Sequence, residues 1–350
     1  MAGWGVVALA DEPGALVAAF VAHHLELGAG AVHVCLDRPN EEAQDLLAGV
    51  PGAHLHAAGA DGWAFQDVGR RPRTHLGRQK YHASRMLAET GLDWLLHCDA
   101  DEFLQPPGEG TIGALLDAAP EAANWLQVAV AERAWIGPGP GADIFAGVFR
   151  LPWDDFARQG RRVYDEAAMH LLHFGLCGHR MGKCFARAGR GLFIGVHQGL
   201  LSFSGETRDP AKAVLDGLRI LHFDGLTELH YGLKMMRRAL NEKPGRKSRH
   251  TEARQVQFLA MAEDAGQGAA MHALHVAAKT VTPAQAEWLA KAGHLRRWHP
   301  EIAARVARVL GQAPDLSPAA FDRALIAREA ELIAHARAAY GFEPEALAAK

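Results

Sequence analysis

The fold class is decided by the segment Asp93-Trp94-Leu95-Leu96-His97-Cys98-Asp99-Ala100-Asp101-Glu102-Phe103-Leu104. Its apolar first half, 94–98, predicts a β-strand that is buried on both faces. Three acidic residues follow at once, and Asp99 and Asp101 stand two positions apart. Two such carboxylates at the end of a buried strand can share a hard divalent cation, because Mg²⁺ and Mn²⁺ prefer oxygen ligands. A bare Asp-x-Asp pair also occurs in unrelated loops, so its weight depends on the surrounding sequence.

The sequence before this segment alternates between strand-like and helix-like patterns. Apolar runs predict strands over 5–10, 31–36 and 54–57, and helical spacing predicts helices over 13–27, 41–47 and 75–90. Such alternation predicts an α/β fold with a mostly parallel central sheet and flanking helices. Ligands of these sheets bind beyond the carboxyl ends of the strands. Asp11, Asp37 and Asp61 are therefore expected on the same edge as Asp99. The alternative for each is a helix cap or turn residue.

The rest of the chain divides into a strand-rich and a helical part. Short strands are predicted between 124 and 225, over 125–130, 145–151, 181–187, 192–196 and 218–223. From 226 onward the sequence is rich in Ala and predicts helices over 226–241, 252–265, 283–291, 300–310 and 317–340. A domain boundary is expected near 245, in a basic loop that contains Pro and Gly. A length of 350 residues suits two domains.

Composition excludes several classes of protein. Lys and Arg total 37 against 40 Asp and Glu, a formal net charge of −3, which argues against a dedicated nucleic-acid binder. No apolar stretch reaches the length that spans a bilayer, so no transmembrane segment is expected. The four cysteines form no Cys-x-x-Cys pair, and the N-terminus lacks a signal-peptide pattern. Both features predict a reducing, cytoplasmic location.

Four segments together resemble the family 2 glycosyltransferases of the GT-A fold, in particular the family 2-like group with a D-x-D-E-F motif. They are Ala10-Asp11-Glu12-Pro13, Phe20-Val21-Ala22-His23-His24-Leu25-Glu26-Leu27-Gly28, Val32-His33-Val34-Cys35-Leu36-Asp37 and the stretch 94–104. The resemblance covers 1–105 well, continues loosely through 182–185, 197 and 221–223, and does not cover 250–350. It implies a GT-A domain over 1–245, with a nucleotide-binding half (1–105) and an acceptor half (106–245), followed by a helical region over 246–350.

The resemblance also implies roles for individual residues. Asp11, Glu12 and Asp37 would lie near the nucleotide, and Asp99 and Asp101 would form the motif that binds metal and diphosphate. A late histidine often completes the metal site in such enzymes, and the two candidates here are His197 and His222. One departure is the sequence Asp37-Arg38-Pro39-Asn40, where family members often have a polar residue and then Ser. The ligand of Asp37 therefore stays open.

Further site residues follow from position and chemistry. Glu102 either belongs to the site or caps the following turn. Gln79 could reach the donor sugar or diphosphate, or else lie on a solvated helix face. Lys183 could contact a phosphate as a point charge, a role for which Arg180 and Arg187 compete. An inverting transfer needs a carboxylate base near the acceptor hydroxyl, and the candidates are Asp154, Asp155 and Glu166.

The expected function is a metal-dependent (Mn²⁺ or Mg²⁺) glycosyltransferase of the hexosyltransferase type, acting in polysaccharide biosynthesis. It would move a sugar from a UDP- or GDP-sugar to a glycan or lipid-linked acceptor. The alternative is a non-catalytic carbohydrate- or nucleotide-binding protein that kept the GT-A fold. A dinucleotide-dependent oxidoreductase is disfavoured because Asp11-Glu12-Pro13-Gly14, and no G-x-G-x-x-G turn, follows the first strand. A zinc hydrolase is disfavoured because the chain has no H-E-x-x-H motif. The helical region could cover the acceptor, contact a membrane surface peripherally or form a homodimer.

Overall fold

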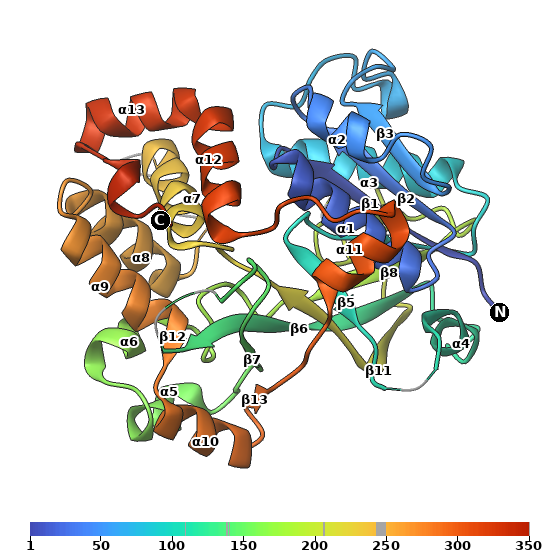
Figure 1. Ribbon diagram of the computed structural model, residues 1–350. Coiled ribbons are helices and arrows are strands. Elements are labelled where there is room, and N and C mark those ends of the chain that lie inside the picture. Colours follow the sequence, from blue (N-terminus) through green and yellow to red (C-terminus); the bar gives the residue numbers. More distant parts are fainter. Residues whose placement is uncertain (109, 138, 140, 206, 243–249, 350) are drawn as a thin grey trace. The chain divides into compact units, whose positions relative to one another are not determined.

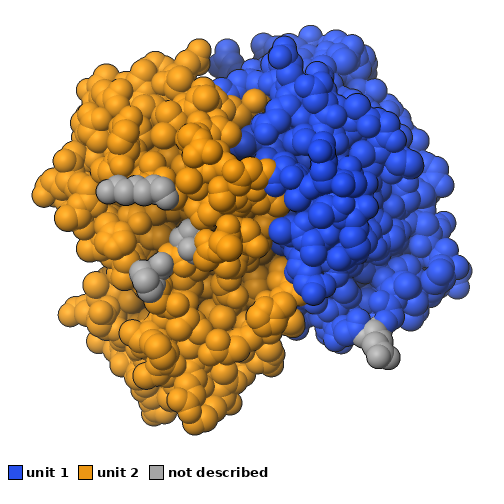
Figure 2. Space-filling view, viewed as in Figure 1, with its two compact units in different colours: residues 1–130, 181–220, 301–314 blue, residues 131–180, 221–300, 315–350 orange. Residues whose placement is uncertain are grey.

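The computed structural model describes residues 1–108, 110–137, 139, 141–205, 207–242 and 250–349. The chain divides into two compact units, each built from three segments (Figure 2). Unit 1 comprises Met1–Val130, Met181–Ile220 and Glu301–Pro314, and unit 2 comprises Ala131–Arg180, Leu221–Pro300 and Asp315–Lys350. The expected boundary near 245 lies outside the described residues, so the division into 1–245 and 246–350 stays a prediction.

The sheet of unit 1 contains the parallel strands that the sequence predicts. Their order is β3 (Ala53–Ala57), β2 (Ala31–Leu36), β1 (Trp4–Ala10) and β4 (Trp94–His97). Val6 of β1 lies between Val32 and Leu96 of its two neighbours. All seven residues of β1 and all four of β4 are buried, which explains why their sequences are continuous apolar runs.

Antiparallel strands extend this sheet, so it is mixed, and the expected mostly parallel sheet is not what forms. β8 (Lys183–Arg187) runs antiparallel to β4, and the first part of β6 (Trp125–Ile136) runs antiparallel to β8. β5 (Glu102–Gln105) pairs with β11 (Lys212–His222). β9 (Phe193–Ile194) and β10 (Gly199–Leu200) form a separate antiparallel pair. The coarse expectation of a mixed α/β protein with helices beside a sheet is confirmed.

The helices of unit 1 are α1 (Gly14–Glu26), α2 (Glu41–Leu46), η1 (Phe65–Asp67), α3 (His75–Glu89), α4 (Ile112–Asp117) and α11 (Ile302–Leu310). Three of them, α2, α3 and α4, begin at a residue whose side chain caps the first turn. The side chains of Asn40 and Thr74 accept hydrogen bonds from backbone N–H groups in the first turns of α2 and α3. α11 packs beside α1 although some 275 residues separate them, and Arg308 forms a 2.7 Å ion pair with Glu26 there (Figure 1).

Unit 2 is mostly helical. Its strands are the end of β6, antiparallel β7 (Val148–Arg150), β12 (Thr280–Val281) parallel to β6, and β13 (Leu295–Arg296) antiparallel to β7. Its helices are α5 (Phe156–Gln159), η2 (Gly160–Arg162), α6 (Glu166–Leu171), α7 (Glu228–Asn241), α8 (Glu252–Glu263), α9 (Gly268–Lys279), α10 (Pro283–Lys291), α12 (Pro318–Arg328), α13 (Ala330–Tyr340) and η3 (Pro344–Ala346). Across the described part of the chain, none of the helices is long and apolar enough to cross a membrane.

A buried carboxylate organises the inner part of unit 2. Glu132, 1% exposed, accepts hydrogen bonds from the backbone N–H groups of Cys177 (2.7 Å) and Gly178 (2.6 Å). The guanidinium of Arg150 donates a third at 3.1 Å. Several hydrogen bonds to one ionised group offset its loss of hydration, so this carboxylate fixes the path of the chain around 177–178.

Candidate functional site

The carboxyl ends of β2, β1 and β4 meet at one edge of the unit 1 sheet, and acidic residues follow each of them. The N–H of Asp37, just after β2, donates to the carbonyl of Ala10 at 2.9 Å. The N–H of Cys98, just after β4, donates to the carbonyl of Val7 at 3.2 Å. These bonds continue the parallel pairing to the strand ends. The structure therefore brings Asp37 and the segment that begins at Asp99 to the edge where the sequence predicts them.

Asp99 is held by two nitrogen donors. The Nζ of Lys183 lies 2.8 Å from Oδ2 of Asp99, and the side-chain amide of Gln79 donates to Oδ1. The same Nζ lies 3.2 Å from Oε2 of Glu102, and that oxygen accepts the backbone N–H of Asp99 at 2.8 Å. The Lys183 side chain is 1% exposed and that of Asp99 is 33% exposed. Lys183 thus pairs with both carboxylates from inside the sheet and offsets one of their two charges, while Asp99 keeps part of its surface toward solvent.

The electrostatics of this cluster favour the charged forms of both partners. Burial opposes ionisation of Asp99, but the ammonium of Lys183 outweighs it and holds the pKa of Asp99 well below its usual range. Burial also opposes protonation of Lys183, but Asp99 and Glu102 raise its pKa above the usual value. Burial and the nearby Lys183 lower the pKa of His97 to about 3, so its ring is neutral at physiological pH.

The other acidic residues of this edge are paired with arginines. Arg38 binds Asp11 through Nε, at 2.8 Å and 2.9 Å from the two carboxylate oxygens. Arg78 binds Asp37 through Nε and Nη2, the latter at 2.6 Å, and Arg71 adds a contact at 2.5 Å. Burial raises the pKa of Asp37, but the hydrogen bonds from the two arginines outweigh it and leave the pKa lowered.

The remaining acidic residues predicted here lie in the same part of the fold. The backbone carbonyl of Glu12 accepts a 2.9 Å hydrogen bond from the side-chain amide of Asn40. Asp61 accepts hydrogen bonds from the hydroxyl of Tyr81 and pairs with Arg85 at 3.1 Å. Each acidic strand end therefore has a cation or hydroxyl beside it.

The chemistry of Asp99 and Asp101 fits a divalent cation completed by substrate oxygens. Both are carboxylates, Asp101 is 6% exposed, and Mg²⁺ commonly takes one or two carboxylates together with substrate phosphates. Among the described residues, no three His, Cys, Asp or Glu side chains gather as a group that could hold a metal by themselves. A cation held by Asp99 and Asp101 would take its further oxygens from a ligand, water or backbone carbonyls.

The two histidines predicted for the metal site fall in different units. His197 lies in unit 1, where its Nδ1 pairs with the carbonyl of Gly182 at 2.9 Å, next to Lys183. His222 lies in unit 2, where its ring stacks 6.4 Å from that of His179. His197 is therefore part of the surroundings of Lys183, and a metal-binding role for either histidine stays a prediction.

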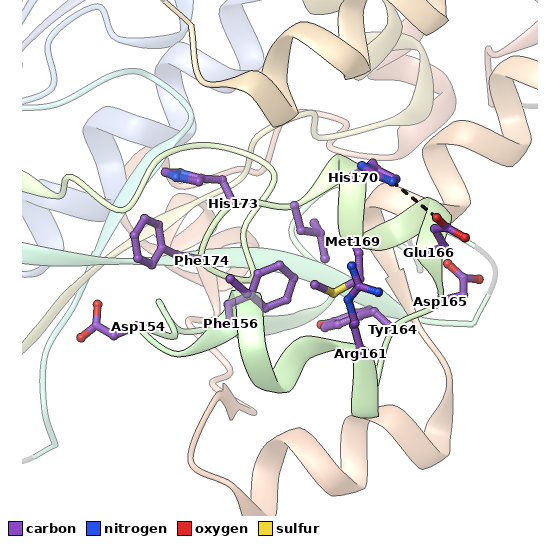
Figure 3. A pocket seen from close by; sticks show the side chains of 12 residues that line it. Asp154, Phe156, Arg161, Tyr164, Asp165, Glu166, Met169, His170, His173 and Phe174 are labelled. Carbon is purple, nitrogen blue, oxygen red and sulfur yellow. Dashed lines mark ion pairs between the residues drawn. The ribbon is translucent and has the colours of Figure 1, made fainter.

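The predicted acceptor-side carboxylates belong to unit 2. Asp154 and Glu166 line a cavity of about 600 Å³ (Figure 3), and Asp154 pairs with Arg180. Asp155 stands at the start of α5, where it binds Arg158 and Gln159 instead. The structure therefore brings two of the three candidate bases to one cavity and turns the third toward its own helix.

Sequence reasoning missed the arginines of the strand-end edge, Arg38, Arg71 and Arg78. A signal for two of them was present, since the segment Arg70-Arg71-Pro72-Arg73 and Arg78 precede and open α3. A basic cluster between a strand end and the next crossover helix lies on the ligand side of a parallel sheet. It could therefore have been read as a source of cations for that edge.

No protein-family model matches the chain, and comparison with curated proteins also gave no match. Solved structures that are similar to it include HddC from Yersinia pseudotuberculosis, with 9% sequence identity and a TM-score of 0.26. The similarity covers 40% of this chain and 63% of that one. A likeness of this size carries no argument about fold or function. The resemblance to the family 2 glycosyltransferases therefore stays a prediction based on the motifs.

Proposed function

We propose that the chain is a metal-dependent glycosyltransferase of the family 2-like, GT-A type that uses a nucleoside-diphosphate sugar. The observation that carries the proposal is the strand-end edge of unit 1. There, Asp37 and the Asp99–Glu102 segment follow the ends of β2 and β4, the two strands that flank β1, with basic side chains beside them. This edge of a parallel sheet is where nucleotides bind in α/β proteins, and it offers both carboxylates and arginines to a diphosphate.

Each part of the edge has a role in this proposal. Asp11, Glu12 and Asp37 contact the base or ribose of the nucleotide. Arg71, whose side chain is 54% exposed, is able to exchange its contact with Asp37 for a phosphate oxygen. Such an exchange lets the protein bind an anion without burying a new uncompensated charge.

Asp99 and Asp101 hold a Mn²⁺ or Mg²⁺ ion together with the diphosphate. The ion supplies charge neutralisation for the departing nucleoside diphosphate. Lys183 and Gln79 act as positioning residues, because their contacts fix the orientation of the Asp99 carboxylate. Glu102 fixes the backbone of the loop by accepting the Asp99 N–H.

Unit 2 supplies the acceptor side in this proposal. A glycan or lipid-linked sugar would present its hydroxyl to a carboxylate base, and Asp154 and Glu166 are the candidates that line a cavity. Asp155 is the weaker candidate, because Arg158 and Gln159 occupy its oxygens. The proposed location is the cytoplasm, where nucleotide sugars are available.

One observation favours a second function, a nucleotide- or carbohydrate-binding protein without catalysis. Both carboxylate oxygens of Asp99 accept hydrogen bonds from protein side chains, those of Gln79 and Lys183. A carboxylate satisfied in this way has less need of a metal ion. Binding of nucleotide with no turnover of any nucleotide sugar would support this second function.

The test is an assay of donor hydrolysis and transfer with a panel of UDP- and GDP-sugars, with and without Mn²⁺. Asp101→Asn should lower the metal-dependent rate by about 10²–10³-fold, the usual cost of losing one electrostatic contact to a transition state. The matched control is Asp216→Asn, at an exposed position of β11 in the same unit, which should leave the rate unchanged. An Asp101→Asn variant with the wild-type metal-dependent rate would refute the proposed site.

A further inference from the structure

The cavity of unit 2 combines an apolar floor with a polar rim. Phe156 and Tyr164, 4% and 5% exposed, line its floor, and the exposed carboxylates of Asp154 and Glu166 stand at its rim. Figure 3 shows Asp154 beside Phe174 at one end, Glu166 at the other, and Phe156 between them. A volume of about 600 Å³ is in the range of pockets that bind small molecules.

Phe174 lines this cavity and has a backbone conformation that is unfavourable for a bulky residue. His173 and Leu176 exchange backbone hydrogen bonds of 2.8 Å and 3.1 Å, so Phe174 and Gly175 form the two-residue loop of a hairpin. Their φ angles are +54° and +76°. Loops with φ above zero at both central positions strongly prefer Asn-Gly or Asp-Gly, and a bulky residue at the first position is an outlier. Phe174 is also only half-buried, so part of its side chain is accessible.

Two side chains pack against the ring of Phe174. The guanidinium of Arg180 stacks 3.9 Å from the ring centroid and also pairs with Asp154. The ring of His173 approaches its edge, with a centroid distance of 4.4 Å. One guanidinium therefore links the aromatic platform to the carboxylate next to it. Strained residues that the surrounding structure holds in this way are typical of ligand-binding sites.

We propose that this cavity is a binding site for a neutral saccharide. An aromatic platform with adjacent carboxylates suits a pyranose ring, which has apolar C–H faces and hydroxyl groups around its edge. The cavity has three carboxylates, those of Asp154, Asp165 and Glu166. Arg180 pairs with Asp154, and Arg161 and His170 also line the cavity, so positive and negative groups are mixed and no single strong charge selects an ionic ligand. The assignment of this saccharide as the acceptor rests on the proposed glycosyltransferase function, whereas the binding itself does not.

The test is the binding of the labelled full-length chain to an array of neutral and anionic oligosaccharides, without nucleotide sugar. The wild type should bind neutral glycans, and Phe174→Asn should weaken that binding at least tenfold. Its melting temperature should equal or exceed that of the wild type, because Asn-Gly suits this hairpin loop. Asp154→Asn should also weaken binding tenfold and cannot unfold the protein through lost packing, because the Asp154 side chain is 88% exposed.

The matched control is Tyr340→Asn, which removes a half-exposed aromatic residue of unit 2 that does not line the cavity, and which should bind like the wild type. Unchanged glycan binding by Phe174→Asn and Asp154→Asn would overturn the proposal, as would a wild type that binds only anionic glycans or none. A sugar-transfer assay separates the two proposals. Transfer without glycan binding would refute this site alone, and glycan binding without transfer would refute the glycosyltransferase function alone.

Discussion

Replacing Lys183 with Met should expose the energetic role of the buried cation at the strand-end edge. Met keeps the length and apolar stem of the side chain but removes the ammonium, which lies 2.8 Å from Asp99 and 3.2 Å from Glu102. Removing one partner of a buried ion pair costs about 3–5 kcal/mol, because the remaining charge loses its compensation. Since the Asp99 side chain is 33% exposed and keeps some hydration, we expect the lower end, about 3 kcal/mol.

The loss of stability in Lys183→Met should depend on pH in a defined direction. In the wild type, the pKa of Asp99 is held below its unfolded value, so its stabilisation is present above that value and does not change between pH 8 and pH 5. Without Lys183, burial and the neighbouring Glu102 raise the pKa of Asp99 above its unfolded value. Protonation of Asp99 then relieves the penalty as the pH falls. The difference between variant and wild type should shrink from pH 8 to pH 5.

The assay is urea unfolding of both proteins at several pH values. Lys183→Met/Asp99→Asn is the control, because it removes the charge that the single variant leaves uncompensated. The double variant should recover part of the stability that Lys183→Met loses, because the two substitutions should be coupled by about 0.5–3 kcal/mol in the free energy of unfolding. A Lys183→Met variant with the wild-type unfolding midpoint, or with a deficit that is constant across this pH range, would refute the reasoning.

Two further substitutions test the surroundings of the site. Burial, with the nearby His56 and His54, lowers the pKa of His33 to about 4, so the folded state favours the neutral ring and loses stability as the pH drops below about 6.5. His33→Gln should therefore reduce the loss of stability between pH 7 and pH 5 in urea unfolding. An unchanged dependence of stability on pH would contradict this. A Cβ at Gly182 would lie 1.7 Å from the carbonyl oxygen of Val128, so Gly182→Ala should destabilise the chain by about 1–3 kcal/mol or more. The control is Gly91→Ala, whose Cβ would meet open space and which should unfold at the same urea concentration as the wild type.

The parallel part of the sheet could be predicted because burial leaves a direct trace in the sequence. β2 matches its predicted range of 31–36, and β1 and β4 differ from theirs by one residue. These strands are buried on both faces or nearly so, and they read as uninterrupted apolar runs. The helix α10, with Thr282 as its cap and Pro283 at its first position, also matches its predicted range of 283–291.

The antiparallel part was predicted less well because its strands carry polar residues. β6 continues to Ile136 through Glu132 and Arg133, which find partners only through tertiary contacts. β11 begins at Lys212, six residues before its predicted start, and its first half is largely exposed. The predicted helix over 317–340 is two helices, α12 and α13, divided at Glu329. Local periodicity does not reveal pairing or breaks that distant segments determine.

Only the part of the candidate site that depends on strand ends could be predicted from the sequence. The positions of Asp37 and Asp99 follow from the strand ends, which are local features. The pairing of Lys183 with Asp99 joins residues 84 positions apart, and it depends on the antiparallel placement of β8 beside β4. A lysine at the start of an apolar strand predicted a charged contact, but its partner could be identified only from the order of the strands in the sheet.

The central claim is that the strand-end edge of unit 1 binds a nucleoside diphosphate together with a divalent cation. Calorimetric titration of UDP and GDP into the full-length chain, with and without Mn²⁺, measures this most directly. We predict that one of the two nucleotides binds more tightly with Mn²⁺, because the diphosphate and the carboxylates of Asp99 and Asp101 need a shared cation. Asp101→Asn should lose this gain. Absence of binding, or affinity that changes neither with Mn²⁺ nor with Asp101→Asn, would contradict the claim.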